Sequence, residues 1–395
     1  MKVLIATQIF PNHARPEMAP YNRHQFAALA KYCDVDMRAL IPVHPATRVL
    51  ERWRATDQPI IPKKTELDGL RILHPRVLYI PKVGQVAAGA TYFASLAPQL
   101  LPLRGKVDVV LGSFAYPDGW ASVFLGRLLG APTVIKVHGS DINVLPKSRL
   151  LRPNIRFALS RAAAVVAPSR PLLDAAVGLG ATAQHSRVVM NGVNTRLFRV
   201  RERGACRRSL GEPEAGRMLL FVGRLEPEKG VDELLEAFRA LSGTHSDARL
   251  VLVGDGVARG RYESFVLQHS LNAHFIGARD HDEIATWLGA SDLLTLPSWA
   301  EGTPNVVIEA LVSGRRVVAT DVGGIPHVVP DPLLGELVPV RDPSKLRAAL
   351  GRALDESYNP GEVAKAAGFG DWSDSAQNLL AVLQDAAHRY RSRAN

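Results

Sequence analysis

Residues 218–241 read MLLFVGRLEPEKGVDELLEAFRAL. The first five residues are apolar, which predicts a buried strand, and apolar residues recur at helical spacing from Val231 onward, which predicts a helix. Glycine, proline and charged residues between the two segments predict a short turn. A buried strand followed by a turn and an amphipathic helix opens a βαβ unit, so this stretch predicts a parallel sheet covered by helices.

The same alternation of short apolar strands and helices extends from this stretch in both directions. In the second half, strands are expected at 218–223, 249–253, 274–276, 292–296 and 317–319, with helices at 231–241, 282–288 and 304–312. In the first half, strands are expected at 3–6, 35–40, 107–111, 133–137 and 164–167, with helices at 23–31, 120–129 and 154–161. This pattern predicts an α/β fold of two doubly wound, Rossmann-like domains facing a cleft, with ligands outside the carboxyl ends of the strands.

The length and one polar stretch indicate where the domains divide. The chain has 395 residues, and a single hydrophobic core rarely grows past about 300 residues, so two domains are expected. Residues 196–217 are rich in charge, Gly and Pro and lack apolar periodicity, which predicts a linker. The expected divisions are residues 1–195, the linker 196–217, residues 218–367, and an amphipathic helical segment within 368–395.

The composition excludes several classes of protein. The longest apolar runs are of strand length, far below the roughly 18 residues that a membrane-spanning helix needs. Met1 leads directly into an apolar strand without a small-residue cleavage site, so we expect no secretory signal and a cytoplasmic protein. Cys33 and Cys206 lie far apart without metal-ligand spacing, which predicts reduced thiols and neither a disulfide framework nor a zinc site.

The net charge of +10 is unevenly distributed along the chain. Residues 1–192 contain 24 Lys and Arg against 11 Asp and Glu, whereas residues 193–395 contain 24 against 27. A positive first half favours an anionic partner, which would be a phosphate-bearing substrate, an acidic membrane surface or nucleic acid. Nucleic acid is disfavoured, because that half has no recognised binding motif and its aromatic residues are not interleaved with its cations. An ordinary solvated surface is the alternative.

The turn in the opening stretch places two cations beside a helix N-terminus. Gly223 ends the expected strand and Arg224 follows it, and Lys229 lies next to the N-terminus of the helix that is expected from Val231. Cations, backbone N–H groups and the positive end of a helix dipole suit a diphosphate. The alternative is an ordinary strand-to-helix turn with surface charges.

A second cluster follows the strand expected to end at Leu296. Thr303 is a good N-cap and Pro304 a good first helical residue, so Glu301 would lie in the loop and Glu309 on the second turn of the helix. Two such carboxylates can face one cleft, one near a sugar and one accepting hydrogen bonds from ribose hydroxyls. Paired carboxylates also occur in glycoside hydrolysis, and two surface glutamates are a further alternative.

Two further motifs bear on ligands and metals. His138 follows an apolar strand and precedes Gly139, where a doubly wound fold binds its ligands, although a lone histidine is often structural. Asp280-His281-Asp282 matches a metal-binding spacing, but Asp280 followed three residues later by Glu283 is a capping box. We therefore expect no metal site and no cofactor.

Taken in order, these motifs resemble the GT-B glycosyltransferases, specifically the group 1, family 4-like retaining enzymes. The resemblance rests on His138 to Asp141, Asn191 to Asn194, Gly223 to Gly230, Gly254 to Gly256, the Glu301 and Glu309 pair, and Gly323-Gly324. It implies a nucleoside diphosphate sugar as donor and a C-terminal helix that crosses back to the first domain. It also implies catalytic roles for His138, Arg224, Lys229 and Glu301, and donor contacts from Gly223, Arg224, Lys229, Gly254, Ser298, Glu301, Gly302, Thr303, Pro304, Asn305 and Glu309.

The loop after the first strand departs from the family pattern. The family has a glycine-rich turn there, whereas residues 10–21 read FPNHARPEMAPY. Pro20 lacks an N–H and Ala19 carries a Cβ, which disfavours close approach to a phosphate. The Phe-Pro-Asn opening and Gln25 resemble a sub-branch acting in exopolysaccharide or cell-envelope synthesis.

The sequence thus predicts a transferase that moves a sugar from a nucleotide sugar to a glycan or lipid-linked acceptor. The basic first half is expected to contact the inner face of an anionic membrane. A nucleotide-sugar 2-epimerase on the same fold is one alternative, and a non-enzymatic polyanion-binding protein is another.

Overall fold

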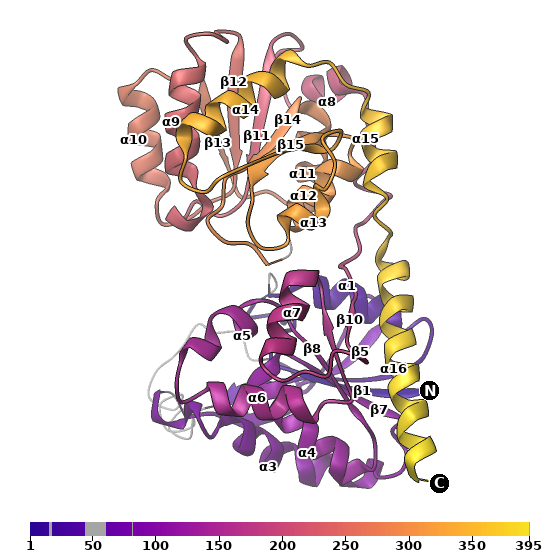
Figure 1. Cartoon of the computed structure of the whole chain (residues 1–395). Helices are drawn as coiled ribbons and strands as arrows, with labels where there is room; N and C mark the ends of the chain where they lie inside the picture. The colour runs from indigo at the N-terminus through magenta and orange to yellow at the C-terminus, as the bar shows by residue number, and fades with distance from the viewer. Residues whose placement is uncertain (16–17, 44–60, 81, 303, 395) are drawn as a thin grey trace. The chain divides into compact units, whose positions relative to one another are not determined.

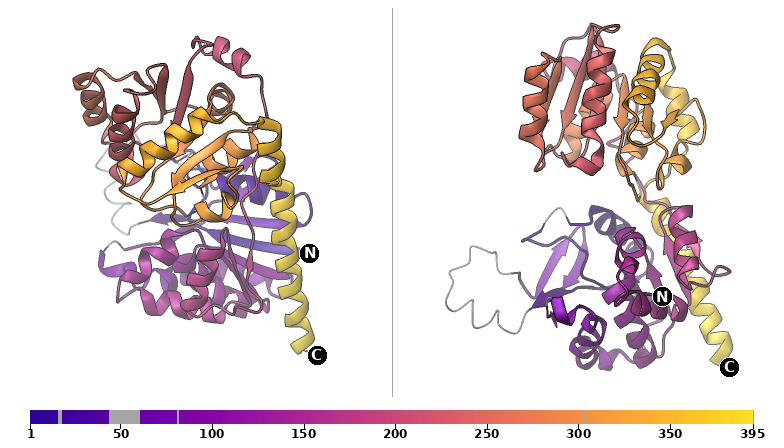
Figure 2. Two further views of the ribbon diagram at one scale, coloured as in Figure 1. Left: turned by 45° about the horizontal axis from the view of Figure 1, so that its top comes forward. Right: turned by 60° about the vertical axis from the view of Figure 1, so that its left-hand side comes forward.

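The computed structural model describes residues 1–15, 18–43, 61–80, 82–302 and 304–394. The chain forms two compact units (Figure 1). Unit 1 contains Met1–Gly192 and the C-terminal segment from Trp372, and unit 2 contains Val193–Asp371. Each unit is built on one large sheet with helices packed against it (Figure 2). Among the described residues, no helix has both the length and the apolar character needed to cross a membrane.

The sheet of unit 1 is parallel except at one edge. Its strand order is β10-β9-β8-β7-β1-β2-β5-β4, and only the β4 and β5 pair is antiparallel. The order reverses between β1 and β7, which makes their carboxyl ends a topological switch point. The strands are β1 (Lys2–Thr7), β2 (Asp34–Ala39), β4 (Lys64–Leu67), β5 (Leu70–Leu73), β7 (Val109–Ser113), β8 (Thr133–Lys136), β9 (Ala164–Ala167) and β10 (Arg187–Val188), with β3 (Ile41–Val43) and β6 (Arg76–Leu78) forming a separate pair.

Helices cover both faces of this sheet, so its central strands are apolar on both sides. Val3 and Ile5 of β1 pack in a cluster with α1 and α16, whereas Leu4 packs on the other face with α3 and α4. The helices are α1 (Pro20–Leu29), α3 (Ala88–Leu100), α4 (Trp120–Leu129), α5 (Ser140–Asn143), α6 (Arg152–Arg161), α7 (Arg170–Gly178) and α16 (Trp372–Ala394), with shorter turns η1 (Lys82–Gln85), η2 (Leu101–Leu103), η3 (Ala115–Gly119) and η4 (Leu145–Lys147).

Unit 2 has a fully parallel sheet with the strand order β13-β12-β11-β14-β15-β16. Read from the first strand of the unit, this is the 3-2-1-4-5-6 order of a Rossmann fold, with its switch point between β11 and β14. The strands are β11 (Arg217–Val222), β12 (Ala248–Val253), β13 (Ala273–Gly277), β14 (Leu293–Leu296), β15 (Arg316–Thr320) and β16 (Gly335–Val338). The helices are α8 (Arg203–Ser209), η5 (Pro227–Lys229), α9 (Val231–Leu241), α10 (Arg259–Gln268), α11 (His281–Ala290), α12 (Asn305–Val312), α13 (Ile325–Val328), α14 (Pro343–Asp355) and α15 (Pro360–Ala367).

The expected linker differs from the structure. Residues 196–217 belong to unit 2 and contain α8, which packs on α11. Arg207 explains why this polar stretch is ordered: its side chain is 1% exposed, donates to the Ala290 carbonyl and pairs with Asp292 at 2.7 Å. The chain leaves unit 1 after Gly192, and α16 returns from Trp372 to pack beside α1 (Figure 1).

The strongly patterned elements lie where the sequence predicts them. The expected helices at 120–129 and 231–241 and the strand at 164–167 are confirmed residue for residue. The other expected elements exist with ends shifted by one to three residues. The expected start of α12 is wrong by one residue, because the helix begins at Asn305 with Pro304 at the N-cap and not as the first helical residue. The helices α3, α5, α7, α8, α10, α13, α14 and α15 are additional to those expected.

Candidate active site

The switch point of unit 1 carries a cluster of buried polar residues. Asp118 accepts hydrogen bonds from the Thr7 hydroxyl at 3.1 Å and the Gln8 amide at 2.9 Å, and burial raises its pKa to about 8. Asp141, on α5, accepts from the amides of Ala115 and His138, both at 2.9 Å. Asp141 therefore fixes the loop after β8 against the segment after β7.

His138 lies directly beyond β8 and is partly buried. Its ring stacks on Tyr21, with ring centroids 5.1 Å apart, and on Phe114 at 6.3 Å. Burial and the neighbouring Lys136 hold the pKa of His138 well below its ordinary value, so the imidazole is neutral at physiological pH. Phe114 adopts φ 124°, a conformation that costs about 1–3 kcal/mol for a residue with a side chain and that concentrates at functional sites.

A hollow of about 230 Å³ opens beside Phe114 in unit 1. Its lining includes the aromatic residues Tyr79, Tyr92, Phe114 and Tyr116, with Gln8 among the polar residues. Tyr92 donates its hydroxyl to the Gln8 side chain at 3.0 Å. Aromatic faces with a few fixed polar groups suit a ligand that is partly apolar, such as the face of a sugar ring.

The loop after β1 keeps an unusual backbone conformation without a glycine. Ala19 is the N-cap of α1 with φ 48°, which is the left-handed region that favours glycine, and Pro20 follows as the first helical residue. Asn12 caps a turn of this loop by accepting from the amides of Ala14 and Arg15.

In unit 2, the structure brings Lys229 and Glu301 together. The Lys229 ammonium lies 2.7 Å from Glu301 Oε1, and the two side chains are 18% and 12% exposed. Arg224 does not join this pair: its side chain is 67% exposed and contacts Glu226 at 2.7 Å. The two expected diphosphate cations are thus both held at the carboxyl end of β11, each against a carboxylate.

Two glycines bring the loops of this edge into backbone contact. Gly254 has φ 143°, and a Cβ there would lie 1.9 Å from the Gly223 carbonyl oxygen. Gly323 has φ 56°, and a Cβ there would lie 1.8 Å from the Glu301 carbonyl oxygen. Neither position tolerates a side chain, so Gly223 and Glu301 are fixed by loops from neighbouring strands.

The loop and helix after β14 hold the other expected donor contacts. Ser298 is fully buried, and its hydroxyl has no hydrogen-bond partner among the described residues. Gly302 is partly buried against Gly324, Pro304 is buried, and Asn305 opens α12. Thr303 lies outside the described residues.

Glu309 projects from the second turn of α12 into a buried position. Its side chain is 14% exposed, and burial raises its pKa to about 7. His281 Nε2 lies 3.9 Å from Glu309 Oε1, a contact that sequence reasoning missed because the two residues belong to different helices. Asp280 is the N-cap of α11 and accepts from the Glu283 amide at 2.9 Å, as the capping motif predicts.

Sequence reasoning also missed an aromatic contact beside Glu301. Trp299 donates its indole N–H to Glu233 at 3.0 Å, and the Arg341 guanidinium lies 4.1 Å from the Trp299 ring centroid. Arg341 has φ 57°, a strained conformation for arginine. The only sequence signal was the aromatic residue within the Ser298 to Glu309 segment.

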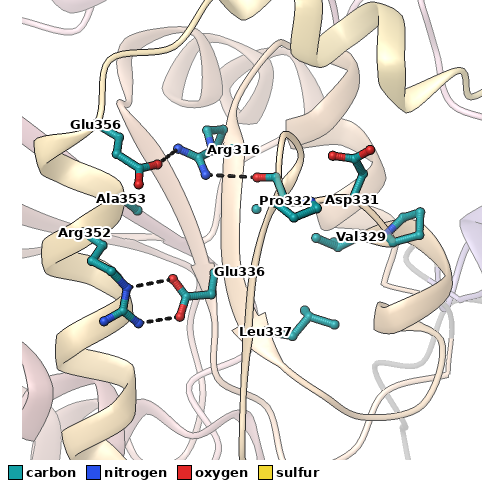
Figure 3. A pocket seen from close by; sticks show the side chains of 11 residues that line it. Arg316, Val329, Asp331, Pro332, Glu336, Leu337, Arg352, Ala353 and Glu356 are labelled. Carbon is teal, nitrogen blue, oxygen red and sulfur yellow. Dashed lines mark hydrogen bonds and ion pairs between the residues drawn. The ribbon is translucent and has the colours of Figure 1, made fainter.

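A larger hollow of unit 2, about 520 Å³, lies elsewhere (Figure 3). It is lined by residues at the amino ends of β15 and β16 and by α14, and four of its charged residues form two pairs, Arg316 with Glu356 and Arg352 with Glu336 (Figure 3). Ligands of doubly wound sheets bind at the carboxyl ends of the strands, so this hollow is not the donor site.

Comparisons with known proteins agree with this geometry. Residues 202–368 match the family Glycosyl transferases group 1, and residues 54–197 match Glycosyltransferase Family 4. The chain is similar to the putative teichuronic acid biosynthesis glycosyltransferase TuaC of Bacillus subtilis, with 30% identity over 82% of both chains. It is also similar to D-inositol 3-phosphate glycosyltransferase 1 of Catenulispora acidiphila, with 30% identity over 85% of this chain and 86% of the relative.

The fold is shared with solved structures at lower identity. Anabaena HepE in complex with UDP matches with a TM-score of 0.72 and 20% identity, over 98% of this chain and 100% of HepE. The two Rossmann-like units are therefore those of a GT-B fold. The chain belongs to the group 1, family 4-like glycosyltransferases, and the protein is a glycosyltransferase.

Proposed function

We propose that the protein transfers a sugar from a nucleoside diphosphate sugar to a glycan or lipid-linked acceptor, with retention at the anomeric carbon. The observation that carries the proposal is the contact between Lys229 and Glu301 at the switch point of unit 2. Similar solved structures support this choice of donor, because Anabaena HepE was determined with UDP and with UDP-glucose.

Each proposed donor contact follows from the chemistry of the side chain. Departure of the nucleoside diphosphate builds negative charge on phosphate, so Arg224 and Lys229 would stabilise the transition state more than the ground state. Glu301, the Ser298 hydroxyl and the backbone of residues 302–305 would hydrogen-bond the sugar. Glu309, as a carboxylate, would accept from the ribose hydroxyls. Gly223 and Gly254 would give the backbone close access to the donor.

Unit 1 would supply His138 as a hydrogen-bonding group toward the sugar and the hollow beside Phe114 as part of the acceptor site. The leaving phosphate itself can take the acceptor proton, so the proposal needs no protein carboxylate as covalent nucleophile. Neither a cofactor nor a divalent metal has a role in it.

The test is transfer by Lys229→Ala and Arg224→Ala, with Lys365→Ala on exposed α15 as the matched control. Loss of one cation facing developing charge is expected to lower kcat by about 10²–10³, with unchanged thermal unfolding. The control should transfer sugar at the wild-type rate. Wild-type turnover in both site variants would refute the diphosphate assignment.

Product analysis separates transfer from its alternatives. Sugar attached to an acceptor, with the donor's anomeric configuration retained in the NMR spectrum, is the expected result. A free epimerised nucleotide sugar would indicate a 2-epimerase, a reaction that the relatives reported above do not favour.

We further propose that unit 1 binds anionic membrane through one basic surface. Lys147, Arg149, Arg152 and Arg156 have no ion-pair partner in the described part of the chain, and the last three line one hollow with Phe157. Val144 and Leu150 beside them are 56% and 70% exposed. Each cation near an anionic surface contributes about 1 kcal/mol, and the exposed aliphatic residues would add burial.

Sedimentation with vesicles tests this surface. The protein is expected to sediment with vesicles that contain anionic lipid and to remain in the supernatant when the vesicles are neutral. Its binding to anionic vesicles should be lost near 0.5 M salt. Replacing the four cations by glutamine should weaken binding. Equal recovery in the supernatant with both vesicle types would contradict the proposal and favour a soluble acceptor.

A further inference from the structure

A chain of fully buried polar side chains lies beneath His138 in unit 1. Asn22 and Gln25 of α1, Ser113 at the end of β7 and Lys136 at the end of β8 are each 0% exposed. Buried polar groups are costly unless they are hydrogen-bonded, and a buried lysine is the most costly of these. Because burying these four polar side chains in the sheet costs free energy, we infer that they have a function.

Lys136 meets amide oxygens rather than a carboxylate. Its ammonium donates to Asn22 Oδ1 at 3.1 Å and to Gln25 Oε1, and it lies over the rings of Tyr21 and Phe26 at 5.6 and 5.4 Å. Burial lowers the pKa of Lys136 to about 7. Both the charged and the neutral amine have at least two N–H groups, so Lys136 donates to both amides in either state.

The orientation of the Asn22 amide is fixed from both ends. Its oxygen accepts from Lys136, and its nitrogen donates to the Ile9 carbonyl at 2.9 Å and to Ser113 Oγ at 3.1 Å. A backbone carbonyl can only accept, so the reversed amide would place two acceptors together at Ile9 and two donors together at Lys136.

The Gln25 amide is fixed in the same way. Its nitrogen donates to Ser375 Oγ on α16 at 2.8 Å, and the Ser375 hydroxyl donates to the Met190 carbonyl at 2.6 Å. Lys136 is therefore held between two amides that cannot turn. The hydrogen bonds therefore run in one direction: Lys136 donates to Asn22, and Asn22 donates to Ser113.

The same logic extends to the histidine ring. Ser113 Oγ already accepts from Asn22, and its remaining contact is His138 Nε2 at 2.8 Å. The serine oxygen could also accept from an Nε2–H, but its own hydrogen would then have no acceptor among the described residues. Pointing that hydrogen to Nε2 satisfies both atoms and makes Nε2 the unprotonated acceptor nitrogen. Nδ1 then carries the proton, and it has no hydrogen-bond partner among the described residues.

We propose that Lys136, Asn22 and Ser113 are positioning residues that hold His138 as the neutral tautomer with its proton on Nδ1. His138 then acts as a hydrogen-bond donor to a sugar oxygen and not as a general base. This role rests on the proposed function, in which His138 faces the sugar.

The tautomer of His138 can be measured directly by NMR, without measuring enzymatic activity. Long-range ¹H–¹⁵N spectra of the full chain with ¹⁵N-labelled histidine distinguish a protonated ring nitrogen from a bare one, and the His138 signals are those missing in His138→Gln. The wild-type protein is expected to have a protonated Nδ1 and a bare Nε2. A bare Nδ1 in the wild-type protein would overturn the proposal.

Asn22→Asp is expected to reverse the direction of the hydrogen bonds between residue 22, Ser113 and His138. A carboxylate at this position still accepts from Lys136 but can donate neither to Ser113 nor to the Ile9 carbonyl. The contact with Ile9 is lost, and the serine hydroxyl turns to Asp and accepts from His138 Nε2–H. The expected result is an inverted tautomer with kcat lowered about 10²-fold. Asn154→Asp is the matched control, because Asn154 donates to the Val86 carbonyl on the surface of the same unit and should leave the tautomer unchanged.

Ser113→Ala covers the case in which Asn22→Asp does not fold. It removes the donor to Nε2, so the fixed Nδ1–H signal should be replaced by a mixture of tautomers. An unchanged Nδ1–H signal in a folded Asn22→Asp or Ser113→Ala protein would refute the proposal that Asn22 and Ser113 fix the tautomer of His138. Full transfer by His138→Gln would instead refute the sugar contact while leaving the spectroscopic result intact, so the two failures are distinguishable.

Discussion

The buried position of Glu309 predicts how the free energy of unfolding changes with pH. Burial raises its pKa to about 7, whereas an exposed glutamate titrates near 4.5, so the folded protein holds this proton more tightly than the unfolded chain does. The contribution of Glu309 to stability is therefore fully present below the unfolded-state pKa and is lost as the pH rises through about 7, because ionisation of the buried carboxyl opposes folding. Glu309→Gln removes this titration.

The size of the effect follows from the shift. About 2.5 pKa units correspond to about 3 kcal/mol, reached above pH 7, and most of the loss is still absent near pH 5. The free energy of unfolding of Glu309→Gln minus that of the wild type should therefore rise by roughly 2 kcal/mol between pH 5 and pH 8. Any pH-independent cost of the amide cancels in this difference.

Hydrogen exchange of unit 2 peptides in urea measures the difference without assuming that both units unfold together. Glu362→Gln, an exposed glutamate of α15, is the matched control and should give a constant difference. A Glu309→Gln curve that runs parallel to the wild-type curve from pH 5 to pH 8 would show that the carboxyl is not desolvated. The same variant should bind donor more weakly, since an amide is a poorer partner for two ribose hydroxyls.

Three other outcomes are expected. Gly323→Ala should weaken donor binding at least tenfold, because its Cβ would meet the Glu301 carbonyl; Gly211→Ala, also at positive φ but with open space around it, should lose only stability. Equal donor affinities in the two variants, by isothermal titration calorimetry, would exclude a role for the Gly323 contact. Turnover should persist in excess EDTA, since Asp280 is a helix cap; restoration by Mn²⁺ or Mg²⁺ of activity lost to EDTA would show the opposite. Donor affinity should change less than about threefold between 0.05 and 0.5 M salt, a range over which vesicle binding by the basic surface is lost.

The parts of the fold that sequence predicts well are those set by local pattern. The strand at 164–167 and the helices at 120–129 and 231–241 have uninterrupted periodicity and clear ends, so their boundaries are confirmed. The polar stretch at 196–217 lacks periodicity, yet it folds because Arg207 is buried against backbone carbonyls and Asp292. That contact joins residues 85 positions apart, and local pattern does not reveal it.

The candidate site also contains some residues that local sequence pattern predicts and others whose contacts depend on tertiary packing. Lys229 and Glu301 could be singled out because each stands in a turn beside a predicted strand, and the structure joins them. His281 near Glu309 and Arg341 over Trp299 depend on how separate elements pack, as do the contacts of Lys136. In the sequence TVIKVHG, Lys136 is one polar residue in an apolar strand, and only the three-dimensional contacts indicate why a lysine is there.

The distribution of charge fits a division of labour between the two units. Residues 193–395 have three more acidic than basic residues, so no overall positive field draws an anionic donor to unit 2. In the proposed function, local attraction would come from Arg224 and Lys229, and both already contact carboxylates. A diphosphate would exchange with Glu301 as the partner of Lys229, and such an exchange spares the lysine from being left unpaired in a partly buried place. It would also free Glu301 to meet the sugar hydroxyls at the moment the phosphate arrives. Under the proposed function, the surplus of cations in residues 1–192 is not needed for the donor. Arg152 and Arg156 of α6, which have no ion-pair partner among the described residues, would be available to a larger anionic surface.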